Sequence, residues 1–267
     1  MDLKDKIAVV TGGSRGVGKG IAIGLAELGA HVYITGRTEN GTESGLPDFL
    51  KNTSINHTAQ LIRENGGLCT AIKCDHSHDE ETKAVFNLIY EKHGRLDILV
   101  NNAWGGSMHA MQAYYFKTPF WEQPISIWDD HYSVGVRSNY VASWCAAKIM
   151  KNQSKGLIVN ISYLGGERYM NNVSYGVCKA TVDRMTRDMA EELKEYGVVV
   201  NSIYPGVVRT EGMIEYAKYD KNCDISTMES PIDVGKCIGV LYSDSNGIDH
   251  TGEVIKTIDL KASNFFI

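Results

Sequence analysis

Short runs of aliphatic residues alternate with amphipathic stretches along the chain. Each run has the length of a buried strand, and the stretches between the runs repeat apolar residues every three or four positions, which predicts helices. This alternation is typical of parallel β-α-β units, so we expect an α/β fold. Strands are predicted at residues 6–10, 31–35, 68–74, 96–100, 157–162, 198–203 and 253–258. Helices are predicted at about 17–28, around 85–90, and at 58–65, 127–150, 174–196 and 232–242.

A glycine-rich segment, TGGSRGVG at residues 11–18, lies between the first strand and the first helix. Free backbone N–H groups and the positive end of the helix dipole converge at such a junction, which favours a phosphate group. Gly12 permits the tight turn, Gly16 lets a ligand approach the backbone, and Gly18 lets the helix pack close to the strand. The spacing differs from the common GxGxxG fingerprint, so a purely structural glycine turn is the alternative.

Two arginines indicate which dinucleotide this turn would bind. Arg37 follows the second strand, where NAD-specific folds carry an acidic residue for the ribose 2′-hydroxyl, and Arg15 adds a cation inside the turn. Two cations suit a 2′-phosphate, so we expect NADP(H) to be preferred, with NAD(H) as the second choice. If both arginines are merely solvated, no preference follows. Asp75, at the end of the third strand, can accept a hydrogen bond from the adenine amino group.

Irregular segments interrupt the pattern at four places. Residues 38–56 form a polar loop, residues 104–128 an aromatic loop that can wall an apolar pocket, and residues 207–230 a candidate substrate lid. A packing cover over the helix below is the alternative for the aromatic loop. The tail 261–267 is a candidate cap of the site or a contact with a neighbouring subunit. Because no repeat or linker divides the chain, residues 1–267 are predicted to form one domain.

Composition narrows the classes of function. The 267 residues carry 27 Lys and Arg against 32 Asp and Glu, a formal net charge of −5 with both signs interspersed. Without a basic stripe, neither nucleic acid nor a membrane surface is an expected partner. No apolar stretch approaches the roughly 20 residues of a membrane helix, and no signal peptide precedes the first strand. The cysteines and histidines show no metal-ligand spacing, so we expect reduced thiols, no metal site and a cytoplasmic protein.

Tyr175 and Lys179 lie four positions apart and share one face of the helix predicted at 174–196. A tyrosine has a reference pKa of about 10, too high for a base at neutral pH. A nearby ammonium stabilises the phenolate, as does an oxidised nicotinamide, so Lys179 is expected to lower the pKa of Tyr175. Ser162 ends the preceding strand, and its hydroxyl can hold a substrate oxygen against Tyr175. The pattern predicts proton transfer coupled to hydride transfer by a cofactor.

As a set, these motifs resemble those of the short-chain dehydrogenase/reductases. The shared elements are TGGSRGVG, NNA at 101–103, NIS ending at Ser162, YGVCK from Tyr175 to Lys179, and Pro205-Gly206. The resemblance spans nearly the whole chain. It implies a Rossmann-type, doubly wound parallel sheet of about seven strands with helices on both faces, a three-layer α/β/α fold. It also implies a homodimer or homotetramer joined through the helices at about 127–150 and 174–196.

The resemblance further implies roles for individual residues. Tyr175 would be the proton donor in reduction, Lys179 would bind the nicotinamide ribose and tune Tyr175, and Ser162 would orient the carbonyl. The implied reaction is reversible NADPH-dependent reduction of a ketone or aldehyde, with a steroid, lipid or xenobiotic favoured by the apolar walls. The dinucleotide contacts expected are Gly12, Ser14, Arg15, Val17, Gly18, Arg37, Asp75, Asn102, Tyr175, Lys179, Pro205, Gly206, Val207 and Thr210.

Three departures from the family pattern bear on the site. Gly135 stands where the family usually has an Asn that keeps a water-linked proton relay to the lysine in place, and Asn139 is a candidate substitute one turn later. Trp104 follows NNA where the family has Gly, which places a large ring beside the cofactor cleft. The loop after the fifth strand is one residue short, so alignment on the strand makes Tyr163 the orienting residue. Alignment back from the helix gives Ser162, which we prefer.

The replacement of Asn by Gly135 also raises an alternative function. The chain would then be a dinucleotide-binding regulator or scaffold with weak or lost catalysis. Tight NADPH binding without turnover across a broad carbonyl panel would favour it, whereas the complete set of Ser162, Tyr175 and Lys179 favours the enzyme.

Overall fold

The computed structural model describes residues 2–42, 46–112, 114–170, 172–244 and 247–262. Most of the tail considered above, residues 263–267, lies outside the described residues, so its proposed role as a cap stays a prediction.

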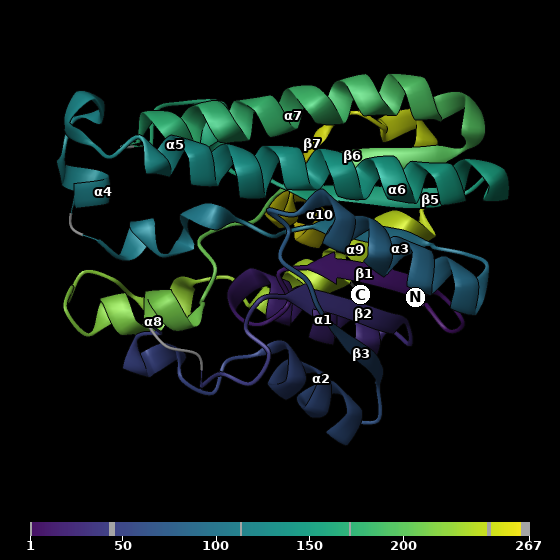
Figure 1. Cartoon of the computed structure of the whole chain (residues 1–267), viewed down its shortest axis with the longest axis horizontal. Helices are drawn as coiled ribbons and strands as arrows, with labels where there is room; N and C mark the ends of the chain where they lie inside the picture. The colour runs from purple at the N-terminus through teal and green to yellow at the C-terminus, as the bar shows by residue number, and fades with distance from the viewer. Residues whose placement is uncertain (1, 43–45, 113, 171, 245–246, 263–267) are drawn as a thin grey trace.

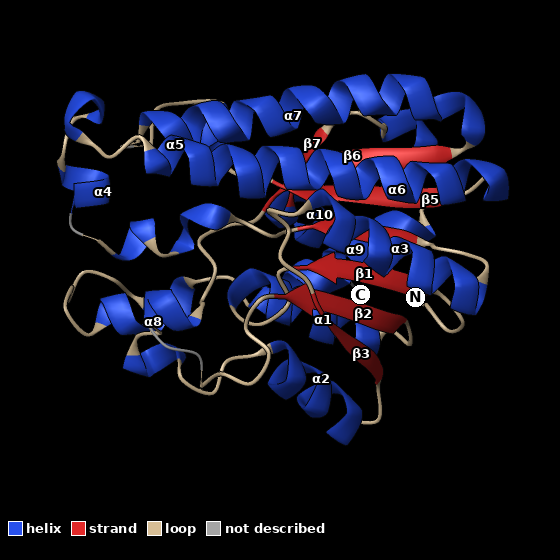
Figure 2. Cartoon of the chain, in the orientation of Figure 1, coloured by secondary structure: helices blue, strands red, loops and turns tan. Residues whose placement is uncertain are grey.

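Seven parallel strands form one sheet in the order β3-β2-β1-β4-β5-β6-β7 (Figure 2). This confirms the predicted doubly wound α/β fold. The strands are β1 (Ile7–Thr11), β2 (His31–Gly36), β3 (Leu68–Lys73), β4 (Ile98–Asn101), β5 (Gly156–Ile161), β6 (Val198–Tyr204) and β7 (Val254–Lys256).

The last strand is shorter than predicted, because residues 257–258 belong to a helix. β7 pairs with β6 up to Lys256, which lies opposite Tyr204. Tyr204, the last residue of β6, is followed by Pro205, which has no N–H to donate to a continuing β-ladder. Thr257 therefore leaves the sheet and begins the final helix.

Helices cover both faces of the sheet. Along β1, Ala8 and Val10 face one hydrophobic core, while Ile7 and Val9 face a second core on the other side of the sheet. This alternation follows from the two-residue period of a strand. The helices are α1 (Gly16–Glu27), α2 (Ile55–Glu64), α3 (Asp79–His93), α4 (Tyr114–Lys117), α5 (Ser126–His131), α6 (Ser138–Gln153), α7 (Val173–Leu193), α8 (Glu211–Ala217), α9 (Pro231–Ser243) and α10 (Thr257–Ala262).

The single helix predicted at 127–150 is wrong, because the structure divides it. A π-helical segment at Tyr132–Arg137 separates α5 from α6, and Val134 and Gly135 have non-helical backbone angles. The apolar spacing continues through this segment, so periodicity alone does not reveal the kink. Gly135, one of the two residues at this kink, stands where the family pattern has Asn.

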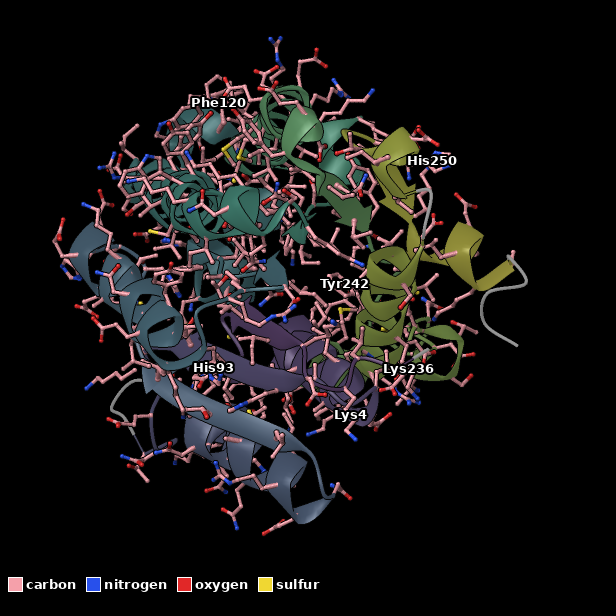
Figure 3. The ribbon with its side chains drawn as sticks, turned by 90° about the vertical axis from the view of Figure 1, so that its right-hand side faces the viewer. Lys4, His93, Phe120, Lys236, Tyr242 and His250 are labelled. Atoms are coloured by element: carbon pink, nitrogen blue, oxygen red, sulfur yellow. The ribbon has the colours of Figure 1, made fainter. Side chains whose placement is uncertain are left out.

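The carboxyl ends of the strands define the functional edge of the sheet. In Figure 1 the arrowheads of β1 and β2 point toward the side that carries α4 and α8. Figure 3 looks onto the opposite edge, with His93 at the end of α3 and Tyr242 near the end of α9. In open parallel sheets, ligands bind beyond the carboxyl ends where the strand order reverses, here between β1 and β4.

Candidate active site

The glycine-rich turn has the geometry that the sequence predicts. Gly12 and Gly16 have φ of +71° and +58°, a region that side chains other than glycine rarely adopt. A Cβ on Gly18 would lie 2.3 Å from the Gly12 carbonyl oxygen, so Gly18 lets α1 begin directly against the turn. Arg15, the N-cap of α1, makes no side-chain cap, so its side chain does not cover the N–H groups of the first helical turn.

Asn102, the residue directly after β4, supports this turn. Its Nδ2 donates to the carbonyl oxygens of Thr11 at 2.9 Å and Gly12 at 3.1 Å. Its backbone N–H donates to Thr11 Oγ1 at 3.0 Å. The side chain therefore fixes the backbone that would hold a diphosphate. The sequence motif alone does not distinguish this supporting role from a direct contact with the dinucleotide.

A carboxylate lies at the position where the sequence predicts a phosphate. The Gly16 N–H at the start of α1 donates to Glu211 Oε2 at 2.8 Å, and Lys19 Nζ lies 3.8 Å from Glu211 Oε1. Glu211 is the first residue of α8 in the lid. The turn thus accepts an anion in the structure, as expected for the N-terminus of a helix.

The charged corner at the ends of β2 and β3 brings together the predicted adenosine-side residues. Arg37 Nη1 lies 4.0 Å from Asp75 Oδ2, and two-thirds of the Arg37 side chain is exposed. Arg15 Nη2 donates to Thr38 Oγ1 at 2.7 Å, which holds a second guanidinium at this corner. Both cations are thus close to the sheet edge where a nucleotide ribose would lie.

The segment after β6 lies against the turn. A Cβ on Gly16 would contact Thr210 Cγ2 at 3.6 Å, and Thr210 Oγ1 caps α8 by accepting from Met213 N–H. The Gly206 N–H donates to Glu229 Oε2 at 2.7 Å, which anchors the loop that follows Pro205. Of the other predicted contacts, Ser14 and Val17 are half-buried in the turn and Val207 is half-exposed.

Tyr175 and Lys179 lie on one face of α7, as predicted. Asn172, the N-cap of this helix, accepts the Tyr175 N–H at 2.9 Å and fixes the first turn. Lys179 Nζ donates to the Ile161 carbonyl oxygen at 2.9 Å and lies 5.8 Å from the centre of the Tyr175 ring. The ammonium is therefore held between the end of β5 and the phenol.

The expected lowering of the Tyr175 pKa by Lys179 is wrong. Burial raises the pKa of Tyr175 well above its ordinary value, and Tyr163, Cys178 and Asp183 raise it further. Burial lowers the pKa of Lys179, while Cys178 and Asp183 oppose that effect. A phenol in this environment keeps its proton, which suits an acid that donates to a substrate oxygen.

Ser162 and Tyr163 point to different surroundings. The Ser162 side chain is buried, with 2% exposed, and its Oγ donates weakly to the Lys179 carbonyl oxygen at 3.4 Å. Tyr163 is half-buried and contributes to the electrostatic environment of Tyr175. Both residues therefore stay candidates for the orienting hydroxyl.

Trp104 occupies the space beside Gly135. A Cβ on Gly135 would lie 3.4 Å from Trp104 Cδ1 and 3.3 Å from Cys178 Sγ. The Trp104 ring also meets the Tyr175 ring edge-on at 5.6 Å, as expected of a large ring beside the site. Asn139, the candidate substitute, is buried, and its Oδ1 accepts from Ser138 Oγ at 3.4 Å.

His131 is a site residue that the sequence analysis missed. Its buried ring stacks on Trp104, and its two nitrogens lie 3.2 Å from Tyr115 Oη and 2.8 Å from Ser174 Oγ. Burial, with smaller contributions from nearby cations, lowers the pKa of His131 to about 4. Because its partners come from distant segments, no local spacing could have revealed this cluster.

The aromatic loop has two parts. Trp104 and Tyr115 lie with His131 beside Tyr175, whereas Phe120 and Trp121 are largely exposed. The exposed part borders a separate pocket of about 210 Å³, and Figure 3 shows Phe120 at the periphery. Whether this loop walls a substrate pocket or covers the helix below it stays a prediction.

The described part of the chain offers neither a metal-binding cluster nor a membrane-spanning helix. Within it, no cluster of three His, Cys, Asp or Glu side chains could hold a metal ion. Nor does any described helix combine the length and apolar character needed to cross a membrane.

Comparison with known proteins connects this geometry to a family. The family model for short chain dehydrogenases matches residues 6–220. Dehydrogenase/reductase SDR family member 1 of Mus musculus is 41% identical over 97% of this chain and 81% of its own length. A 7α-hydroxysteroid dehydrogenase structure with NADH and 7-oxo glycochenodeoxycholic acid has a TM-score of 0.75 and 26% identity, covering 96% of this chain and 93% of its own.

A metagenomic short-chain oxidoreductase solved in complex with NADP is also similar. It has a TM-score of 0.73 and 27% identity, and the match covers 95% of this chain and 96% of that chain. Together with the glycine-rich turn and the Tyr175–Lys179 pair, these matches identify the chain as a member of the short-chain dehydrogenase/reductase family, an NAD(P)-dependent oxidoreductase.

Proposed function

We propose that the protein reduces a ketone or aldehyde to an alcohol with NADPH, reversibly, and that Tyr175 is the proton donor. One observation carries this proposal: the Tyr175–Lys179 face of α7 and the anion-accepting turn at Gly16 lie at the same edge of the sheet. Bound NADPH supplies the hydride. The chain has to supply the proton, the orientation of the carbonyl and the exclusion of water.

Each residue then has a defined task. The Tyr175 hydroxyl donates its proton to the substrate oxygen, since burial keeps that hydroxyl protonated. Lys179, held by the Ile161 carbonyl, binds the ribose next to the reacting ring and stabilises the phenolate left behind. Glycines 12, 16 and 18 admit the diphosphate, and Asn102 keeps their backbone in place.

The NADPH preference rests on Arg15 and Arg37. Both guanidinium groups lie at the ends of β1 and β2, where the ribose 2′-phosphate would lie, and a charge-assisted contact favours that phosphate. Arg37 has to leave its ion pair with Asp75, which is long and exposed and therefore weak. The similar structures carry NADP in one case and NADH in another, so they support a nicotinamide dinucleotide, and the two arginines are what supports NADPH.

An apolar substrate fits the walls of the site. Trp104, Tyr115 and His131 form an aromatic cluster beside Tyr175. Neutral His131 adds little charge, which suits a steroid, lipid or xenobiotic carbonyl better than a sugar. The 7-oxo bile acid named with one similar structure is a ligand of this kind.

We assign the orienting hydroxyl to Ser162 and keep Tyr163 as the alternative. Ser162 lies at the strand end directly behind Lys179, whereas Tyr163 lies in the surroundings of Tyr175. The pair Ser162→Ala and Tyr163→Phe separates them, because loss of the orienting hydroxyl lowers kcat far more than loss of the other.

We also propose that residues 1–267 form a single domain with the loops named above, and that the protein is cytoplasmic. We further propose that it forms a homo-oligomer. Tyr140 and Trp144 on α6, and Val173 and Val177 on α7, leave large apolar side chains exposed on the two long helices. Such residues favour a homodimer or homotetramer through these helices. Light scattering after size exclusion measures the assembly.

The regulator or scaffold alternative is not favoured. That alternative was based on the loss of the Asn that keeps the relay to Lys179 in place. In the structure the helix is kinked at Gly135, and the Ile161 carbonyl oxygen holds Lys179 without that Asn. The experiment is an NADPH-oxidation screen against aldehydes, ketones and steroids, with dissociation constants for NADPH and NADH. Turnover with tighter NADPH binding is expected. Binding without any turnover would restore the alternative.

A further inference from the structure

Behind the proposed proton donor lies a buried carboxylate with no role in the reaction described above. Asp183 follows Lys179 by four residues, as Lys179 follows Tyr175, so the three share one face of α7. Its side chain is buried, with 4% of the residue exposed. Tyr204 at the end of β6 donates a short hydrogen bond to Asp183 Oδ2.

The backbone of the segment after β5 closes over this carboxylate. A Cβ on Gly166 would lie 2.3 Å from Asp183 Oδ2, 2.9 Å from Tyr204 Oη and 3.2 Å from the Lys179 carbonyl carbon. Glycine at this position therefore leaves the carboxylate packed between α7 and β6. On the same side, Ser162 donates to the Lys179 carbonyl oxygen.

One oxygen of the carboxylate needs a compensating charge. Asp183 Oδ1 is buried and has no hydrogen-bond partner among the described residues. A buried carboxylate oxygen is costly unless a cation or a proton balances it. The ammonium one helical turn away belongs to Lys179, which is itself buried and donates to one backbone carbonyl. Each charge therefore lowers the cost of burying the other.

We propose that Asp183 is a positioning residue that keeps Lys179 charged behind Tyr175. The inference rests on the proposed function, in which the Lys179 ammonium binds the ribose and stabilises the Tyr175 phenolate. It also offers a reason why the site can operate with Gly135 in place of Asn, since the charge of the lysine is held from behind by a carboxylate.

Asp183 changes the pKa values of Lys179 and Tyr175 in the same direction. The negative charge of Asp183 raises the pKa of Lys179 and also that of Tyr175. Removing the charge lowers both values, so the protonated pair needed for carbonyl reduction is lost at lower pH. Other titratable groups face this cluster from five elements: Tyr204 from β6, Cys178 from α7, Tyr163 and Glu167 from the segment after β5, His131 from α5 and Tyr115 from α4.

Two variants separate the charge from the hydrogen bond. Asp183→Asn keeps an acceptor for the Tyr204 hydroxyl but removes the charge, while Tyr204→Phe removes the hydrogen bond and keeps the charge. For each, kcat for reduction of 4-nitrobenzaldehyde with NADPH is measured from pH 6 to 10. The NADPH dissociation constant is measured over the same range by fluorescence, because loss of the ammonium should weaken binding without any need for turnover.

We expect the alkaline fall of kcat, and the rise of the dissociation constant, to move about one pH unit toward acid in Asp183→Asn. Tyr204→Phe should leave both positions unchanged. If Asp183→Asn does not unfold cooperatively, Asp183→Ser takes its place with the same expected shift.

An unshifted Asp183→Asn, or equal shifts in both variants, would overturn the proposal and leave Asp183 a structural residue. If the wild type binds NADPH but reduces no carbonyl, the proposed function fails, and the binding series still decides the role of Asp183. If the wild type does not bind NADPH at any pH, both proposals fall.

Discussion

Gly135 and Trp104 pack against each other beside the proposed proton donor. A Cβ on Gly135 would lie 3.4 Å from Trp104 Cδ1, and the Trp104 ring meets the ring of Tyr175 at 5.6 Å. The absence of a side chain at residue 135 and the large ring at residue 104 are therefore complementary. Two departures from the family pattern that are separate in the sequence form one contact in the structure.

This contact predicts that restoring the family's Asn harms the protein. Gly135→Asn forces Trp104 and Cys178 apart, which we expect to cost about 1–3 kcal/mol of unfolding free energy and to lower kcat. Gly135→Ala needs a shift of only a few tenths of an ångström and is the matched control with a smaller loss. Urea unfolding and steady-state kinetics measure both. Higher activity in Gly135→Asn would show that the relay residue is missing rather than replaced.

The carboxylate of Glu211 at the glycine-rich turn predicts competition with the cofactor. A diphosphate that uses the Gly16 N–H has to displace Glu211 Oε2. Glu211→Gln removes the negative charge, so we expect the NADPH dissociation constant to fall about threefold to fivefold. Glu215→Gln, on the same helix and paired with Lys218, should leave it unchanged. Titration calorimetry provides the constants, and weaker binding in Glu211→Gln would contradict this account.

Cofactor preference should depend on Arg37. Arg37→Ala removes a cation from the end of β2, so we expect NADPH to bind about tenfold more weakly and NADH to bind as before. Lys73→Ala is the control, because Lys73 is an exposed cation on neighbouring β3 that pairs with Glu39. Fluorescence titrations with both nucleotides decide the question. Equal losses for NADPH and NADH would show that Arg37 does not read the 2′-phosphate.

The buried His131 predicts a loss of stability in acid. The folded chain has a His131 pKa of about 4, against about 6.5 for an unfolded histidine, so the unfolded chain binds the proton more tightly. Stability from this residue is present above pH 6.5 and is lost as the pH falls toward 4. The loss at pH 5 relative to pH 7.5 is about 2 kcal/mol.

Urea unfolding at the two pH values measures this loss. Between the two pH values, the free energy of unfolding of His131→Gln should change by about 2 kcal/mol less than that of the wild type. For His250→Gln, at an exposed histidine, it should change as much as in the wild type. An unchanged pH dependence in His131→Gln would contradict this account, because it would mean that folding does not lower the pKa of His131.

The sequence was sufficient for features that are local or repeat along the chain. The strands around Val9, Ile34 and Val159 were found because buried parallel strands are continuous apolar runs. The turn at Gly12 and the shared helix face of Tyr175 and Lys179 follow from fixed spacings. These features place the glycine-rich turn and Tyr175 at one edge of the sheet.

Features that depend on contacts between distant segments could not be predicted. The kink at Gly135 interrupts a helix whose apolar spacing continues through it, and Glu211 reaches Gly16 across 195 positions. The shift of the Tyr175 pKa was predicted with the wrong sign, because burial raises this pKa and Tyr163, Cys178 and Asp183 raise it further. The role of Asp183 likewise depends on Tyr204, which belongs to another strand.

The proton-donor role of Tyr175 is tested most directly by Tyr175→Phe. This variant keeps the ring that packs against Trp104 and Gly165 but removes the hydroxyl. With a carbonyl that the wild type reduces, the account predicts that kcat falls by a factor of about 10² to 10⁴ while the NADPH dissociation constant stays within about twofold. Reduction at the wild-type rate by Tyr175→Phe would contradict it.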